Sequence, residues 1–348
     1  MKFGANICLD SLMYDLPLVT ITMGDPAGIG PEIILKSLLR DDIYQVCRPL
    51  ILGDAGVLRM ISKGIRPSSF HVVSNPLEVT GKPGLIDVIS VSNLREDSFL
   101  PGRPTVRGGK AMVDYIVKAA ELNRSGQVSA MVTCPINKEL MNRSGYRFDG
   151  HTDLLAHLTH TKDCVMMLAG SRLRVSLVTI HCSLGKVPER LNKELIVKTI
   201  TITCRALEND FAIRRPRVGV AALNPHAGES GLFGLEDEEI IRPAVEEAKM
   251  GGLLADGPFP ADTIFYHAVN GRFDAVVAMY HDQGLIPMKL LHFSDAVNIT
   301  LGLPLIRTSV DHGTAYDIAG KGVADPSSLV AAIKMAARIA RARLKAQG

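Results

Sequence analysis

Residues 18–39 read LVTITMGDPAGIGPEIILKSLL, and this stretch decides the fold class. Its first six residues form a β-branched apolar run, which predicts a short buried strand. A turn rich in Gly and Pro follows, and the apolar residues after it recur with helical spacing. Pro31 suits the first turn of that helix, and the Glu32 carboxylate suits the positive end of the helix dipole. Strand, glycine turn and helix together are the building block of an α/β protein.

The same order recurs along the chain, because several further apolar runs end in polar residues. These runs are RPLILGD (48–54), SAMVTCP (129–135), VSLVTIHC (175–182), RVGVAALNP (217–225) and DAVVAMYHD (274–282). Strands that are apolar on both faces are typical of a largely parallel sheet covered by helices. Ligands of such sheets bind beyond the carboxyl ends of the strands. We therefore expect the chemistry of this protein where these runs end.

The length of the chain and its balance of charged residues limit the classes of function that are possible. The chain has 348 residues, which predicts about two domains. With 39 Lys and Arg against 36 Asp and Glu, the chain does not resemble a general nucleic-acid binder, so an anionic partner should be small. No apolar run approaches the roughly 18 residues that span a bilayer, and no signal peptide is recognisable, so we expect no membrane partner.

The cysteines and the first residues indicate where the protein works. Six scattered cysteines without a CxxC pair predict reduced thiols and a cytoplasmic location. Residues 1–15 show no clear period and are expected to form an N-terminal tail. Translation starts either at Met1 or at Met13, and the sequence leaves both open.

Three histidines stand at or just past predicted strand ends, namely His181, His226 and His281. Each one alone is more often structural than functional. Three imidazoles with an open fourth position, however, describe a catalytic transition-metal site. Nitrogen ligands favour zinc, cobalt, manganese or iron over magnesium, which prefers oxygen.

A second group of residues predicts a phosphate site. The motif GHTD (150–153) precedes an apolar helical stretch, so it either forms an anion site at a helix N-terminus or supplies Thr152 as a helix cap. Downstream, Lys289, Asn298 and Arg307 are surface or capping residues when each is considered alone. Together with the GHTD motif they supply the donors that a phosphate needs.

The loop VDHGTAYDIAGKGVADP (310–326) is the candidate cofactor site. Its small residues allow the backbone to approach a flat ligand closely. A carboxylate at Asp317 would accept hydrogen bonds from both ribose hydroxyls of NAD and would repel the 2′-phosphate of NADP. His312 and Gly313 are, with Asp317, the candidates for cofactor binding. The earlier turn GDPAGIGPE (24–32) is glycine-rich but is not the GxGxxG fingerprint, and a purely structural role of its glycines in the tight turn is the alternative.

These motifs together resemble the 4-hydroxythreonine-4-phosphate dehydrogenase family over residues 18–329. The resemblance is carried by TMGDPAGIGPEI, CPINKE, GHTDLL, ALNPHAGESGLFGLEDE, GPFPADTIF, YHDQGLIPMKLL and VNITLGLPLIRTSVDHGTA. The segments GIGPE and HGTAYDIAGKGVADP are also similar to isopropylmalate and isocitrate dehydrogenases. The resemblance implies a two-domain α/β fold of the isocitrate/isopropylmalate dehydrogenase type, with a mostly parallel sheet and an active-site cleft between the domains.

The resemblance also implies domains and an assembly. Residues 16–133 plus 300–348 would form a discontinuous NAD-binding domain, and residues 134–299 a metal, substrate and dimerisation domain. The family is a homodimer with its sites at the subunit interface. The implied cofactors are NAD and one divalent metal per site, with zinc first and cobalt, manganese or magnesium as alternatives.

Roles for single residues follow from the same resemblance. The three strand-end histidines match the metal ligands of the family. The substrate contacts are matched by His151, Thr152, Lys289, Asn298 and Arg307. Candidates for proton transfer are Lys138, Asp262 and Asp282, each of which could equally be a structural ion-pair partner.

The implied activity is the metal- and NAD-dependent oxidative decarboxylation of a 4-phosphorylated 3-hydroxy acid. The runs IPMKLL (286–291) and GHTDLLAHLTH (150–160) resemble the branch that acts on D-threonate or D-erythronate 4-phosphate more than the vitamin B6 branch, whose substrate is 4-phosphooxy-threonine. Two alternatives stay open: a dehydrogenase of a phosphate-free cis-diol carboxylate, and a non-catalytic regulator that binds a sugar phosphate. The histidine trio argues against the regulator, since a pure binder needs no open metal site.

Overall fold

The structure, a computed structural model, describes residues 16–66, 68–94 and 99–347. The predicted N-terminal tail and both possible start methionines lie outside these residues. Within them, no helix has the length and apolar character needed to cross a bilayer. None of the five cysteines in this part of the chain forms a disulfide, as the sequence predicted.

The chain divides into two compact units. Unit 1 contains the described residues up to Thr161 and returns with Leu303–Arg341, and unit 2 contains Lys162–Gly302 and the residues from Ala342 onward. Each unit is an α/β structure with its own stretch of mostly parallel sheet, so the predicted fold class is confirmed. The functional domain boundaries expected at residues 133 and 299 stay a prediction.

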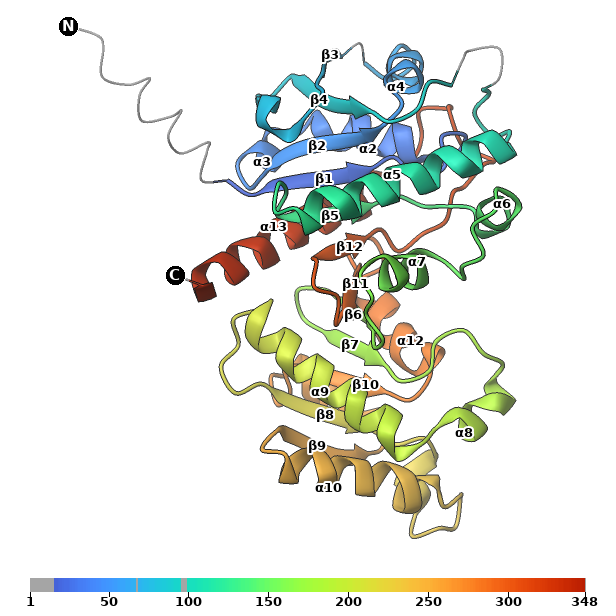
Figure 1. Cartoon of the computed structure of the whole chain (residues 1–348). Coiled ribbons are helices and arrows are strands. Elements are labelled where there is room, and N and C mark those ends of the chain that lie inside the picture. Colours follow the sequence, from blue (N-terminus) through green and yellow to red (C-terminus); the bar gives the residue numbers. More distant parts are fainter. Residues whose placement is uncertain (1–15, 67, 95–98, 348) are drawn as a thin grey trace, which may run out of the picture. The chain divides into compact units, whose positions relative to one another are not determined.

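Unit 1 is built on parallel strands with β1 in the middle (Figure 1). In sheet order the strands are β3 (Ser69–Val72), β4 (Leu85–Ser90), β2 (Arg48–Gly53), β1 (Leu18–Thr22), β5 (Ala130–Thr133) and β12 (Arg307–Ser309). All neighbours pair in parallel. The chain builds outward from β1 on one side through β2 and then returns to the other side with β5. This reversal makes the gap between β1 and β5 the topological switch point, where α/β proteins bind ligands.

Helices cover this sheet. They are α2 (Gly30–Leu38), α3 (Asp41–Tyr44), α4 (Ala55–Ser62), α5 (Val106–Arg124), α6 (Lys138–Arg143), α7 (His151–Leu158) and α13 (Ser327–Gln347), with a 3-10 turn at Pro76–Glu78. The predicted first helix is α2, and it carries Pro31 and Glu32 in its first turn as expected. Helix α5 packs on β1, β2 and β5. Side chains such as Ile21, Ile33 and Leu50 are fully buried there, so the apolar runs form the core.

Unit 2 contains a mixed sheet. In sheet order its strands are β11 (Val297–Leu301), β6 (Val165–Ala169), β7 (Arg174–Leu177), β10 (Ala275–Ala278), β8 (Arg217–Ala221) and β9 (Leu254–Phe259). Strand β6 is antiparallel to both of its neighbours, whereas β7, β10, β8 and β9 are parallel. The expected strands β7, β8 and β10 are therefore present, and they end before the histidines that the sequence placed at their ends.

The helices of unit 2 position its loops. They are α8 (Val187–Arg190), α9 (Lys193–Asn209), α10 (Arg242–Met250), α11 (Ala261–Val269) and α12 (His281–Leu291), with 3-10 turns at Leu184–Lys186 and Pro225–Gly228 and a π-helical turn at Asp237–Ile241. An apolar core joins the sheet to α11 and α12 through residues such as Val175, Val276, Ile264 and Met288. Burial of each large apolar side chain contributes about 1.5–3 kcal/mol, so this core holds α12 against the sheet of unit 2.

Candidate functional site

The switch point of unit 1 is occupied by the glycine turn between β1 and α2. At Gly24 the backbone has φ +70°, and a Cβ there would collide with the carbonyl oxygen of Pro135, just past β5. The N–H of Asp25 donates to that same oxygen at 2.9 Å. The glycine is thus needed for the close approach of two chain segments, which is the structural role that the sequence left open for this turn.

A group of basic side chains, Arg307, Lys138 and His151, lies near the carboxyl end of β5. The Arg307 guanidinium donates from Nε and Nη2 to the hydroxyl of Thr133, at 3.1 and 2.9 Å. Both residues are buried, and burial lowers the pKa of Arg307 to about 10. The charges of Arg307 and Lys138 both act on His151. The structure thereby brings together two predicted substrate residues and one predicted proton-transfer residue.

His151 is the first residue of α7, and Gly150 is the N-cap with φ 151°, a conformation that L side chains rarely adopt. A Cβ at Gly150 would lie 3.5 Å from Cε of Lys138. Thr152 is the second residue of the helix, so its interpretation as the helix cap was wrong. The helix places His151 and Thr152 in its first turn, where the free N–H groups point.

The electrostatics of His151 are those of a neutral base. Burial, and then the positive charges of Arg307 and Lys138, lower the pKa of His151 well below its usual value. Its Nε2 atom is buried and has no hydrogen-bond partner among the described residues. Buried polar atoms are nearly always hydrogen-bonded, so the Nε2 atom of His151, on which two positive charges act, is a candidate contact for a polar ligand.

The cofactor loop 310–326 is fastened to α2. The Glu32 carboxylate accepts the N–H groups of Gly322 and Ala324 at 3.1 and 2.7 Å. Lys36 donates to the carbonyl oxygens of the same two residues at 2.8 and 2.7 Å, and it pairs with Glu32 at 2.9 Å. Glu32 therefore holds a loop from the far end of the sequence, in addition to its expected place in the first turn.

Tyr316 joins this loop to the switch point. Its hydroxyl donates to the Asp25 carboxylate at 2.6 Å and accepts from the Asn137 amide at 3.0 Å. Burial raises the pKa of Asp25, although the hydrogen bonds from Tyr316 and the Ala27 N–H oppose that shift. The sequence singled out none of Asp25, Asn137 and Tyr316 as site residues, because nothing in the local sequence indicates that their side chains meet.

The three predicted cofactor residues lie at the surface of the loop. His312 and Gly313 are exposed, and His312 Nδ1 contacts the Gly313 carbonyl oxygen at 3.1 Å. Asp317 is exposed as well, directly after the anchored Tyr316. Its carboxylate is thus presented to the surroundings from a backbone that Tyr316 holds in place.

In unit 2 the structure brings two of the three predicted metal ligands together. The rings of His181 and His281 have centroids 5.7 Å apart. The segments after β7 and β10 run side by side, since the N–H and hydroxyl of Thr179 both donate to the Met279 carbonyl oxygen, at 3.1 and 2.8 Å. His281 Nδ1 contacts the Asp282 carboxylate at 2.7 Å.

Gln283 ties this region to the loop after β8. It is buried, its Oε1 accepts the Met279 N–H at 2.7 Å, and its amide donates to the Ala222 carbonyl oxygen at 2.6 Å. The sequence did not single it out. Its position directly after the HD pair of YHDQG is the signal that could have done so.

The third histidine, His226, sits in a turn of left-handed backbone. Every residue from His226 to Gly231 has a positive φ, between +43° and +92°. The buried Asp237 carboxylate anchors the approach to this turn by accepting the N–H groups of Leu223 and Asn224 at 2.7 and 3.1 Å. Left-handed non-glycine residues cost of order 1–3 kcal/mol each and cluster at ligand sites. His226 itself is 67% exposed, and its Nδ1 contacts Glu229 at 3.2 Å.

The imidazole nitrogens of these histidines are donors that transition metals prefer. Two of the three imidazoles have a carboxylate on Nδ1, the arrangement that orients ligating histidines in metal sites. Within the described ranges, however, no three His, Cys, Asp or Glu side chains are gathered closely enough to hold a metal ion. His181 and His281 form the preassembled part, and His226 lies apart on its own turn.

The remaining predicted residues also belong to unit 2. Lys289 lies in the last turn of α12, with Nζ 5.6 Å from the centre of the Phe293 ring. Asn298 lies on β11, and its Oδ1 is buried without a hydrogen-bond partner among the described residues. Asp262 is exposed in the first turn of α11. The predicted phosphate donors are thus divided, with His151, Thr152 and Arg307 in unit 1 and Lys289 and Asn298 in unit 2.

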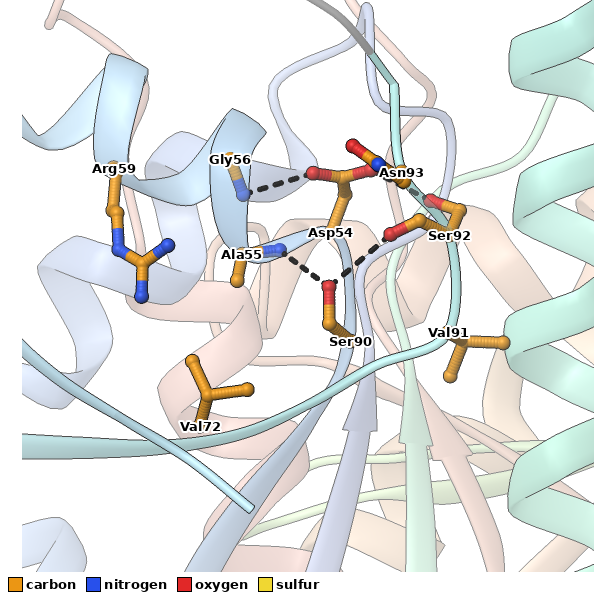
Figure 2. A pocket seen from close by; sticks show the side chains of 9 residues that line it. All are labelled: Asp54, Ala55, Gly56, Arg59, Val72, Ser90, Val91, Ser92 and Asn93. Carbon is orange, nitrogen blue, oxygen red and sulfur yellow. Dashed lines mark hydrogen bonds between the residues drawn. The ribbon is translucent and has the colours of Figure 1, made fainter. Parts of the chain in front are cut away.

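A cavity of about 520 Å³ lies away from the switch point, at the carboxyl ends of β2 and β4 (Figure 2). Its buried acid, Asp54, is already used. One carboxylate oxygen caps α4 through the N–H groups of Gly56 and Val57, and the other accepts from the Ser92 hydroxyl and the Leu94 N–H. Ser90 is likewise engaged, because its hydroxyl accepts the Ala55 N–H. The lining shows no buried polar group that lacks a partner, so the cavity carries no argument for a ligand.

Known proteins match almost the whole chain. Residues 45–336 match the family described as "Pyridoxal phosphate biosynthetic protein PdxA". A protein of Desulforapulum autotrophicum named 4-hydroxythreonine-4-phosphate dehydrogenase is 54% identical over 322 residues, which cover 92% of this chain and 95% of that protein. The D-threonate 4-phosphate dehydrogenase of Cupriavidus necator is 46% identical over 331 residues, covering 94% and 98%. The crystal structure of 4-hydroxythreonine-4-phosphate dehydrogenase from Klebsiella pneumoniae has a TM-score of 0.87 and 42% identity, covering 93% of this chain and 99% of that one.

The sheet, the basic group of Arg307, Lys138 and His151, and these relatives define an α/β dehydrogenase. More specifically, the chain belongs to the family of the pyridoxal phosphate biosynthetic protein PdxA. The family predicted from the sequence motifs is thereby confirmed, and both of its expected dehydrogenase names occur among the relatives.

Proposed function

We propose that the protein catalyses the metal- and NAD-dependent oxidative decarboxylation of a 4-phosphorylated 3-hydroxy acid. One observation carries the substrate class: the orphaned Nε2 of His151 lies beside the charges of Arg307 and Lys138. A neutral imidazole can donate from Nε2, and two cations favour an anion of more than one charge. A phosphate meets both demands, and the names of the relatives state phosphorylated substrates.

Different residues would bind the metal, orient its ligands and transfer the proton. A metal held by His181, His281 and His226 would supply Lewis-acid polarisation of the substrate oxygens. The contact of Asp282 with His281 favours an orienting role for this carboxylate. Lys138, beside Gly150 and His151, is then the proposed proton-transfer group of unit 1.

The reaction itself has two parts. The hydride of the carbon that bears the 3-hydroxyl leaves to NAD while the hydroxyl proton leaves to a base, which gives a ketone β to the carboxylate. The bond to the carboxylate then breaks, and its electron pair stays with the substrate as carbon dioxide departs. Arg307, Thr152 and His151 would hold the phosphate end in register during both parts, and remote binding energy of this kind accelerates the step.

We propose a homodimer with shared sites. Helix α12, which begins at His281 and carries Lys289, exposes Ile286 and Leu290 at 68% and 85%, and Phe293, two residues past its end, is 81% exposed. Large apolar side chains at helical spacing on a surface mark an interaction face. A second copy of the chain on this face is the proposed partner in the dimer. The cytoplasmic location expected from the cysteines stays part of the proposal.

The cofactor preference is tested at Asp317. Replacing Asp317 by Ala is expected to raise the KM for NAD and to lower the KM for NADP, because the carboxylate would bind the ribose hydroxyls and repel a 2′-phosphate. Steady-state kinetics with both cofactors measure the change. The neighbouring exposed residue Lys321 provides a control, since Lys321→Ala should leave the preference unchanged. A wild type that uses NADP as well as NAD would refute the role of Asp317.

The substrate is tested by NADH formation on a panel of acids. The panel contains 4-phosphooxy-threonine, D-threonate 4-phosphate, D-erythronate 4-phosphate, the same acids without phosphate, and an aromatic cis-diol carboxylate. Turnover restricted to phosphorylated acids supports the proposal and identifies the branch of the family. Turnover of the cis-diol would move the protein to the phosphate-free alternative, and binding without any NADH would indicate the regulator.

A further inference from the structure

Thr133 is the residue through which β5 contacts the Arg307 guanidinium. The two side chains are separated by 174 positions in sequence, and the parallel pairing of β5 with β12 brings them together. The register places Ser309 opposite Thr133, and Arg307 begins the same strand. Thr133 is fully buried and Arg307 is 5% exposed, so the contact is shielded from solvent.

The geometry of this contact restricts the guanidinium. Its five N–H donors lie in one plane and have fixed directions. The Thr133 hydroxyl accepts from Nε and Nη2 at once, which holds the edge of the guanidinium that carries these two atoms. Since the group is planar and rigid, holding one edge also sets the direction of its other donors.

The chemistry of the acceptor also matters. A carboxylate in the place of Thr133 would hold the same edge but would offset the positive charge. A hydroxyl orients the group and carries no charge of its own. Arg307 stays protonated at neutral pH, and its charge acts on His151, whose Nε2 lacks a partner. The oriented cation therefore adjoins the place where the anionic group is missing.

We propose that Thr133 is a positioning residue for phosphate recognition, which sets the plane of the Arg307 guanidinium without neutralising it. This inference rests on the proposed function, because it concerns how the same site distinguishes a phosphorylated acid from an unphosphorylated one. Thr133 does not touch the substrate in this proposal. It acts through Arg307 alone.

The test compares three variants of the full-length protein. Thr133→Val removes the hydroxyl at constant shape, and Thr133→Ser keeps it. Thr20→Val is the matched control, because Thr20 is also fully buried and its hydroxyl donates to the Ala130 carbonyl oxygen, away from Arg307. Calorimetric titration with inorganic phosphate gives the Kd, and steady-state kinetics give kcat and KM for a phosphorylated acid and its unphosphorylated counterpart.

We expect Thr133→Val to weaken phosphate binding by about tenfold, the lower end of what a hydrogen bond to a charged group contributes. The KM of the phosphorylated acid should rise by a similar factor, while its kcat should change little. The kinetic constants of the unphosphorylated acid should also change little. Thr133→Ser should restore the affinity, and Thr20→Val should lower the Tm without changing the Kd.

Two results would overturn the inference while leaving the proposed function intact. One is Thr133→Val binding phosphate as tightly as Thr133→Ser. The other is an equal loss of turnover with both acids in Thr133→Val, which indicates a merely structural hydroxyl. Failure of the proposed function looks different, because then the wild type itself binds no phosphate and turns over both acids equally.

Discussion

Replacing His281 by Ala is expected to remove bound divalent metal and to lower kcat/KM by at least about 100-fold, since losing even an outer-shell partner costs roughly 10–100-fold. His281 begins α12 with its ring 5.7 Å from that of His181, so its loss breaks up the pair of histidines that the fold already holds together. Metal content after dialysis, measured by mass spectrometry, reports binding independently of turnover. NADH formation reports the activity.

Two further variants make this result specific. Asp282→Asn keeps the size of the side chain that contacts His281 Nδ1 but removes its charge, and it should weaken metal binding by about 10–100-fold. His267→Ala removes a histidine on α11 that was not predicted as a ligand, and it should leave the metal content unchanged. A His281→Ala protein with full metal content and normal turnover would show that the histidines are structural.

Replacing Arg307 by Ala is expected to lower kcat/KM for the phosphorylated acid by about 10–100-fold or more. Hydrogen bonds to charged groups contribute roughly 1.5–3 kcal/mol each, and Arg307 can hold a phosphate through two of them. Arg307→Lys should recover little, because a lysine keeps the charge but lacks the planar pair of donors. Initial rates at varied substrate give the loss of transition-state stabilisation.

The unphosphorylated acid is the control for this change. Its poor turnover should hardly respond to Arg307→Ala, because that molecule never makes the contact. Two enzymes and two substrates form a cycle, and the coupling between Arg307 and the phosphate is the quantity measured. A coupling near zero would contradict the assignment of Arg307. Equal turnover of both acids by the wild type would exclude phosphate recognition altogether.

The core of the fold was predictable because its signals are local. Strand β1 and helix α2 follow directly from residues 18–39, where an apolar run, a glycine turn and a helical pattern stand in order. Strands β2 and β5 were found in the same way. Strand β12 has only three residues, and β3 has no buried residue, so neither carries an apolar run that could be recognised. The antiparallel position of β6 depends on pairing, which no single segment encodes.

The candidate site was predictable only where one residue type was informative by itself. Histidines at strand ends pointed to His181 and His281, but nothing in the local sequence shows that His226 has φ +52° and lies in a left-handed turn. Thr133 and Tyr316 were missed for another reason. Their partners are 174 and 291 positions away, so their roles exist only once the chain has folded.

Unit 1 is built from two separate segments of the chain, and this has a consequence during protein synthesis. Strand β5 pairs with β1 on one side and with β12 on the other, yet β12 belongs to the segment that starts at Leu303. The ribosome must therefore produce about 140 residues of unit 2, over roughly 7–28 s, before β5 meets its second partner. During that interval an apolar strand edge stays open, and open edges invite pairing with other chains. A nascent chain stalled before Leu303 should thus bind chaperones more strongly than one released at full length.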